Sequence, residues 1–157
     1  MFEFKDFDYL SDGKIDLIID KKVFGDDIKG YVPTYKYKIT LHESSYKIGT
    51  ISIRIGNNEN TELGGHIGYG INEEFRGNSF ASKACKIIMQ VALAHGLNRL
   101  VITCNPNNYA SRKTCENIGA NLNKTIDLPI DSDLYKKGEM QSCKYEWIKS
   151  SVYINLC

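Results

Sequence analysis

The hydrophobic pattern of this 157-residue chain changes its period near residue 79. Upstream, residues 35–41 and 48–55 alternate apolar with polar side chains on either side of a short polar turn, as the two strands of a hairpin do. From Ser79 to His95 the apolar residues share one face of a helix, and Gly96 supplies a stop. A chain that combines these two periods must pack a helix on a sheet, which favours an α+β fold.

The remaining segments complete the expected order of elements. Further strands are predicted at residues 15–20, 66–71, 100–104, 121–128 and 143–149, and a second helix at residues 111–118. Residues 57–62 and 129–142 are predicted loops, and the spacing Gly68-x-Gly70 indicates a bulge or a close backbone approach. We therefore expect residues 1–157 to form a single domain with a mixed, mostly antiparallel sheet and flanking helices.

Composition narrows the classes of partner and compartment. Twenty Lys and Arg against nineteen Asp and Glu leave a formal charge of +1, which provides no global field for nucleic acid or an anionic membrane. The five cysteines form no C-x-x-C pair and are odd in number, which argues against a zinc site and a disulfide framework. No apolar run reaches the length of a membrane span, and no secretory signal pattern opens the chain. We expect a cytoplasmic protein with no metal, and the abundance of Lys, Asn and Ile indicates a low-GC bacterial source.

The segment that carries chemistry lies between the strand at 66–71 and the long helix. The first amides of a helix are unpaired donors at the positive end of its dipole. Small residues at Gly77, Ser79 and Ala81 would let a phosphate approach these amides, so the segment predicts a pyrophosphate cradle. The alternative is an ordinary surface turn in which Ser79 caps the helix.

This segment resembles the cofactor motif of the GNAT acetyltransferase superfamily, which is Arg or Gln, two residues, Gly, one residue, then Gly or Ala. Residues 76–81, Arg-Gly-Asn-Ser-Phe-Ala, match it except that Ser79 stands at the glycine position. Residues 64–69 look like the preceding strand of the family, and residues 102–113 look like the following strand with its Asn-containing turn. The resemblance covers roughly residues 34–150. The ten or so residues after the first strand leave little room for the two helices that many relatives carry, so a shortened amino-terminal helical region is expected.

The resemblance implies an N-acetyltransferase that moves an acetyl group from acetyl-CoA to a primary amine by direct attack in a ternary complex. The amides of residues 77–82 would bind the pyrophosphate, residues 71–73 would pair with the pantetheine arm, and Asn108 and Ser111 would lie near the thioester. The implied cofactor-binding residues are Ile71, Asn72, Glu73, Arg76, Gly77, Asn78, Ser79, Phe80, Ala81, Ser82, Asn108 and Ser111.

Catalytic roles have several candidates. His66 is the first choice for the base that takes the ammonium proton, and Glu62, Glu73 or Glu74 are alternatives. Many relatives place a tyrosine acid seven residues after the asparagine of the turn, but Cys115 stands at that position here. Cys115 is therefore one candidate for the acid and Tyr109 is another. A bulge carbonyl at the Gly68-x-Gly70 segment with polarising amides is a route that needs no side chain.

Other readings of the chain are weighed against this one. The glycines at 64–70 have the wrong spacing for a dinucleotide fingerprint, and no Walker, G-x-S-x-G or His-Glu-x-x-His motif is present. A non-catalytic acyl-CoA-binding sensor is the main alternative, since it would keep the cradle and lose the chemistry. A partner-binding protein that uses the edge of the final strand is a weaker one. The acceptor, a small molecule or a peptide amine, stays open, and a homodimer through the last strands is possible.

Overall fold

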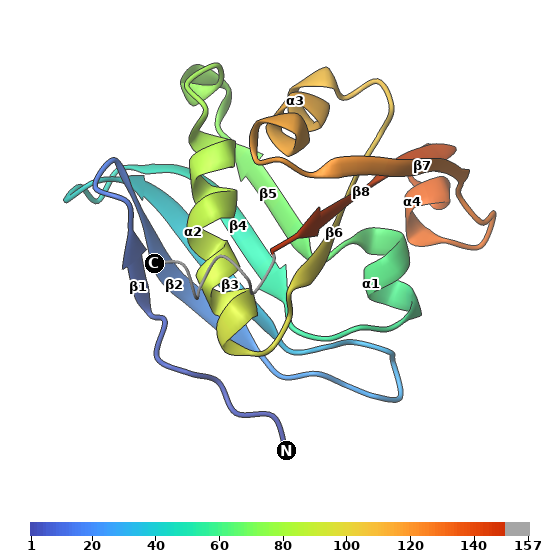
Figure 1. The fold of residues 1–157 in the computed structure, drawn as a ribbon, viewed down its shortest axis with the longest axis horizontal. Helices are drawn as coiled ribbons and strands as arrows, with labels where there is room; N and C mark the ends of the chain where they lie inside the picture. The colour runs from blue at the N-terminus through green and yellow to red at the C-terminus, as the bar shows by residue number, and fades with distance from the viewer. Residues whose placement is uncertain (150–157) are drawn as a thin grey trace.

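The computed structural model describes residues 1–149; Cys157 lies outside this range. Eight strands and five helical segments follow one another within residues 1–149 (Figure 1). The strands are β1 (Tyr9–Ser11), β2 (Ile15–Val23), β3 (Thr34–Leu41), β4 (Lys47–Arg54), β5 (Ile67–Ile71), β6 (Arg99–Cys104), β7 (Asn121–Asp127) and β8 (Gln141–Ile148). The helices are α1 (Glu59–Gly64), the 3₁₀ turn η1 (Glu73–Phe75), α2 (Phe80–Ala94), α3 (Tyr109–Asn117) and α4 (Asp133–Lys136).

The strands form two antiparallel sheets. The first has the order β1-β2-β3-β4-β5, and the second has the order β6-β8-β7. The predicted hairpin is confirmed, because β3 pairs with β4 along its length and Leu41 opens the turn between them. The α+β class is also confirmed, while the described strands contain no parallel ladder that would join the two sheets.

The two sheets meet at one end of β5 and β6. The His66 amide donates to the Val101 carbonyl at 2.7 Å, and the Thr103 hydroxyl donates to the Gly64 carbonyl at 3.2 Å. Beyond this junction β5 and β6 do not pair, although both run toward the same side of the molecule in Figure 1. The edge of β5 is therefore open toward its carboxyl end.

Helix α2 connects the two sheets and supplies much of the core. It packs on β1, β2, β4 and β5, and it contacts α3. Its buried face follows the predicted period, with Ala84, Cys85, Ile88 and Val91 all fully buried. These side chains join one buried cluster with residues of both sheets, such as Leu17 and Trp147. The cluster holds α2 in place, so the position of its first turn is set by the core.

Several local predictions need correction. Residues 59–64 form α1 in place of the predicted loop, because Asn58 caps the helix and Thr61 returns the bond in a capping box. The long loop 129–142 contains the short helix α4, and β1 precedes the predicted first strand. Of the two alternatives predicted for Gly68 and Gly70, a bulge or a close backbone approach, the bulge is wrong, because β5 keeps a regular register with β4. The shortened region between β2 and β3 is confirmed, since residues 24–33 hold only an isolated bridge between Asp26 and Tyr31.

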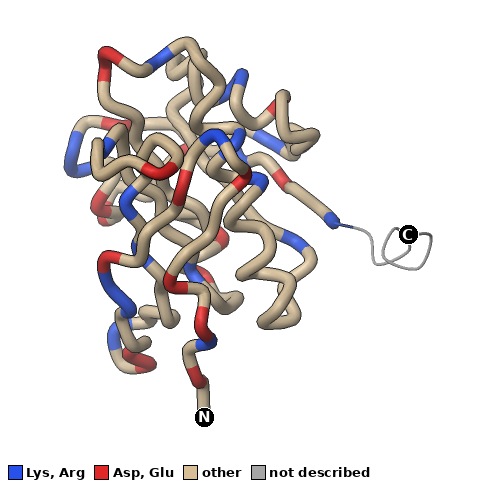
Figure 2. The backbone as a smooth tube through the Cα atoms, turned by 90° about the vertical axis from the view of Figure 1, so that its left-hand side faces the viewer, with Lys and Arg blue, Asp and Glu red and all other residues tan. Residues whose placement is uncertain are grey.

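Charged residues are mixed along the described backbone. Figure 2 shows Lys and Arg segments interspersed with Asp and Glu segments over the face in view. Within residues 1–149, no helix combines the length and the apolar character needed to cross a bilayer.

Candidate functional site

The first turn of α2 presents free amides at the end of β5. Within the described chain, the Lys83 amide donates to the Ser79 carbonyl, but the amides of Phe80, Ala81 and Ser82 have no hydrogen-bond acceptor. Ser79 is the N-cap residue, yet its hydroxyl makes no capping hydrogen bond. The ordinary capped turn, the alternative to an anion cradle, is therefore not what the structure shows. Three unpaired donors at a helix N-terminus are suited to an anion.

The turn before α2 needs left-handed backbone at two positions. Gly77 has φ +86°, and Ser79 has φ +62° with ψ +21°. A residue with a Cβ is disfavoured in this conformation, which explains why a glycine is expected at position 79. Arg76 stabilises the turn from its other end, because its Nε donates to the Ile71 carbonyl at 3.0 Å.

The open edge of β5 offers further backbone groups. The Asn72 amide donates to the Ile48 carbonyl and the Arg54 amide donates to the His66 carbonyl, so the even-numbered residues 66–72 face β4. Antiparallel ladders alternate, and the N–H and C=O groups of Tyr69 and Ile71 consequently point away from β4. The Ile71 carbonyl is taken by Arg76, which leaves the Ile71 amide and both Tyr69 backbone groups for an extended ligand.

A pocket of about 530 Å³ joins the cradle to this edge. Its walls come from β5, the first turn of α2 and the start of α3. The lining residues are Tyr69, Gly70, Ile71, Phe75, Arg76, Gly77, Ser79, Phe80, Ala81, Ser82, Asn108, Ala110, Ser111, Lys113, Thr114 and Asn117. An elongated ligand with an anionic group at one end fits this combination of free amides and strand edge.

Comparison with known proteins identifies the family. Residues 13–121 match the acetyltransferase (GNAT) domain. The chain belongs to the GNAT acetyltransferases. It is 28% identical over 130 residues to the uncharacterized N-acetyltransferase YnaD of Bacillus subtilis (strain 168), a match that covers 75% of each chain.

Solved GNAT structures share the fold. A putative ribosomal-protein-serine acetyltransferase from Vibrio cholerae aligns with a TM-score of 0.66 at 15% identity, over 92% of this chain and 98% of that one. The microcin C7 self immunity acetyltransferase MccE, solved with acetyl-CoA and AMP, aligns with a TM-score of 0.59 at 18% identity. That match covers 74% of this chain, which spans only 61% of the MccE chain.

The GNAT cofactor residues predicted from the sequence lie mostly in the pocket. Asn108 and Ser111 line it from α3, where the Asn108 side chain caps the helix by accepting from the Ser111 amide at 3.1 Å. Three predicted residues, Asn72, Glu73 and Asn78, do not line the pocket. The side-chain amide of Asn78 donates to the Phe75 carbonyl. The Asn72 amide is already bonded to β4, and Glu73 lies exposed in η1.

His66 is fully occupied by the junction of the two sheets. Its Nδ1 accepts from the Val101 amide at 2.8 Å, while Nε2 lies 2.9 Å from the Gly56 carbonyl. The ring is fully buried, and burial lowers its pKa, so it is neutral with its proton on Nε2. In this arrangement His66 has no free lone pair, and action as a base would require the Val101 hydrogen bond to break.

The two acid candidates do not line the pocket either. Cys115 is fully buried in the core, and burial raises the pKa of its thiol to about 12. Tyr109 is the first residue of α3 and is 73% exposed. Sequence reasoning missed Tyr69, which lines the pocket and whose hydroxyl is buried. The alternation of Ile67, Tyr69 and Ile71 on one face of β5 was the signal that could have drawn attention to it.

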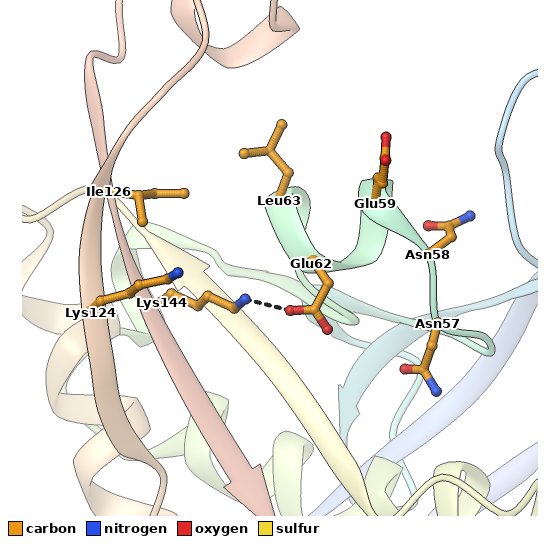
Figure 3. Close-up of a pocket in the computed structure, with 8 residues that line it drawn as sticks. All are labelled: Asn57, Asn58, Glu59, Glu62, Leu63, Lys124, Ile126 and Lys144. Atoms are coloured by element: carbon orange, nitrogen blue, oxygen red, sulfur yellow. Dashed lines mark hydrogen bonds and ion pairs between the residues drawn. The ribbon is translucent and has the colours of Figure 1, made fainter.

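A second groove, of about 560 Å³, lies between α1 and strands β7 and β8 (Figure 3). Glu62 of α1 points across it and pairs with Lys144 of β8. Glu62 also accepts from Arg99 of β6 at 2.7 Å, and these hydrogen bonds, that from Arg99 first, lower its pKa to about 2. The carboxylate of Glu62 thus holds α1 to the second sheet as a permanent anion, which is a poor starting point for a base.

Proposed function

We propose that this protein transfers an acetyl group from acetyl-CoA to a primary amine by direct attack in a ternary complex. The observation that carries the proposal is the set of free amides on Phe80, Ala81 and Ser82, three residues that line the pocket. They would bind the pyrophosphate, and the pantetheine arm would add to β5 through the outward backbone groups of Ile71 and Tyr69. Acetyl-CoA is the cofactor named with MccE, a relative of the same fold.

The proposed reaction needs positioning more than side-chain chemistry. Holding the amine next to the thioester supplies most of the acceleration, since proximity alone is worth several orders of magnitude. The acceptor is a small molecule or a peptide amine, in line with the microcin and ribosomal-protein names of the relatives.

Calorimetry of acetyl-CoA binding tests the cradle. The Ser79→Asp variant places a carboxylate beside the proposed pyrophosphate while keeping a residue type that tolerates the left-handed backbone. We expect the wild type to bind acetyl-CoA at a stoichiometry near one and the variant to bind it at least tenfold more weakly. Ser132→Asp, which puts the same charge at the N-cap of α4 outside the pocket, should leave affinity unchanged.

A non-catalytic acyl-CoA sensor is the second candidate. It is favoured by one observation, namely that none of the predicted acid or base residues lines the pocket. An assay for thiol release with a library of amines separates the two candidates. Release that depends on the amine supports the transferase, whereas tight binding of acetyl-CoA without release from any amine supports the sensor. If acetyl-CoA does not bind to the wild type, both candidates fail.

A further inference from the structure

The hydroxyl of Tyr69 is a buried polar group without a partner. Within residues 1–149 only two buried side-chain oxygen or nitrogen atoms lack a hydrogen bond, and the other, Thr40 Oγ1, is outside the pocket. An unsatisfied buried hydroxyl is unfavourable, since it has lost water and gained nothing. Because Tyr69 is a lining residue of the pocket, the missing hydrogen bond of its hydroxyl is accounted for if a ligand bound there completes it.

The surroundings of Tyr69 make it a donor that keeps its proton. Burial raises the pKa of its hydroxyl above the ordinary value. The Ser111 and Thr114 side chains lie near enough to lower this pKa in part, but neither makes a hydrogen bond of acceptable geometry to the Tyr69 hydroxyl. The Thr114 hydroxyl is itself committed to the Ala110 carbonyl at 3.0 Å. Tyr69 is therefore protonated at any working pH, and it can offer a hydrogen bond to an electron-rich atom in the pocket.

The position of Tyr69 along β5 indicates which part of the cofactor it meets. The cradle lies beyond the carboxyl end of β5, and Tyr69 is two residues further from it than Ile71. A pantetheine arm that leaves the cradle and pairs with Ile71 brings its reactive end toward Tyr69. Ser111 of α3, predicted to lie near the thioester, lines the same part of the pocket wall.

We propose that the Tyr69 hydroxyl donates a hydrogen bond to the sulfur of the bound thioester and of the thiolate that leaves. This inference rests on the proposed function. The amine nitrogen forms a bond to the acetyl carbon, the carbon–sulfur bond breaks, and its electron pair stays on sulfur. The attacking nitrogen loses one proton to water, which balances the charge of the thiolate, and the proton of Tyr69 remains on its own oxygen. The hydrogen bond from Tyr69 strengthens as negative charge develops on sulfur, so it stabilises the transition state more than the bound thioester.

Comparison of CoA with desulfo-CoA tests the contact directly. At pH 8.5, where part of the thiol is ionised, the wild type should bind CoA about tenfold or more tightly than desulfo-CoA. Tyr69→Phe should abolish this preference without weakening desulfo-CoA binding. Tyr37→Phe is the matched control, because it removes a buried hydroxyl that donates to the Phe7 carbonyl far from the pocket lining. It should keep the wild-type preference.

Turnover and stability give independent readouts. Tyr69→Phe should lower kcat by about 10- to 100-fold with the KM for acetyl-CoA within about threefold of wild type. The melting temperature of the unliganded variant should equal or exceed that of the wild type, because an unsatisfied hydroxyl is removed, whereas Tyr37→Phe should lower it. Equal binding of CoA and desulfo-CoA by the wild type, or an unchanged kcat in Tyr69→Phe, would overturn the inference and leave the proposed function standing. Failure of both ligands to bind to the wild type would instead remove the proposed function.

Discussion

At the scale of single residues, the cradle depends on a backbone conformation that its serine does not favour. Ser79 and Glu43 are the two non-glycine residues with positive φ in the described chain. A non-glycine residue with left-handed backbone raises the free energy of the folded state by about 1–2 kcal/mol. At Ser79 no capping hydrogen bond from the hydroxyl offsets this cost. The family motif places a glycine here because only the backbone amides are used.

Replacing Ser79 by glycine should stabilise the protein. The strain is relieved, while the added freedom of glycine in the unfolded chain offsets part of the gain, so we expect about 0.5–1 kcal/mol in urea denaturation. Affinity for acetyl-CoA should stay equal or rise. Glu43→Gly is the control, because it relieves similar strain outside the pocket and should leave affinity as it is. A destabilised Ser79→Gly protein would show that the serine hydroxyl has a partner that the structure does not contain.

At the scale of elements, α1 is held by its cap and by ion pairs with the second sheet. Asn58 accepts from the Thr61 amide at 3.0 Å and donates to the Gly30 carbonyl at 2.9 Å. Glu62 then reaches Arg99 and Lys144, with side chains that are between 12% and 38% exposed. Such half-exposed pairs contribute modestly to stability and are screened by salt. The cap is therefore the stronger local determinant of α1.

Asn58→Ala should destabilise the protein by about 1–2 kcal/mol, because the cap and the bond to Gly30 are both lost. Asn58→Asp keeps the capping oxygen and places a negative charge near the helix N-terminus, so its loss should be clearly smaller. Chemical denaturation of the three proteins measures the difference, and acetyl-CoA affinity should be the same in all. If alanine and aspartate are equally destabilising, the Gly30 contact rather than the cap holds α1.

At the scale of the whole molecule, His66, the residue before β5, couples the two sheets through hydrogen bonds of its amide and its ring to Val101 of β6. Its folded pKa is lowered by burial, so below about pH 6.5 the unfolded chain binds a proton that the folded protein does not. Stability contributed by His66 is therefore present at neutral pH and is lost as the pH falls. His42 has the opposite sign, because its hydrogen bond with Asp16 raises its pKa and its contribution is lost as the pH rises.

His66→Gln should lower stability by about 1–3 kcal/mol at pH 7.5, because the Val101 amide loses its acceptor. The difference from wild type should shrink between pH 6.5 and pH 5, since the variant no longer titrates there. His42→Gln should change the profile on the alkaline side instead. Thermal melts across this pH range provide the measurement, and a wild-type acid slope in His66→Gln would assign the sensitivity to another group. Activity of the folded variant at pH 7.5 would also exclude His66 as the base.

Much of this protein followed from local patterns in its sequence. The hairpin β3–β4 and helix α2 were predicted because hydrophobic period is a property of neighbouring residues. The cradle was predicted for the same reason, since free amides accompany any helix start and the motif around Gly77 marks where that start lies. Helix α1 was missed because the capping box of Asn58 and Thr61 lies in a short polar stretch without a helical apolar face.

Tertiary structure determined which individual side chains are buried, hydrogen bonded or free to react. His66 is a residue type that can act as a base, but the backbone amide of Val101, 35 residues away, donates to the lone pair of its Nδ1. Cys115 takes the position of an acid, but packing of α3 buries its thiol. Tyr69 was not singled out from the sequence, yet tertiary packing makes it a lining residue of the pocket and leaves its hydroxyl buried without a hydrogen bond. Burial and hydrogen bonding of a side chain depend on residues distant in the chain, so the sequence pattern indicated the candidate site and only the fold showed which groups in it are free to act.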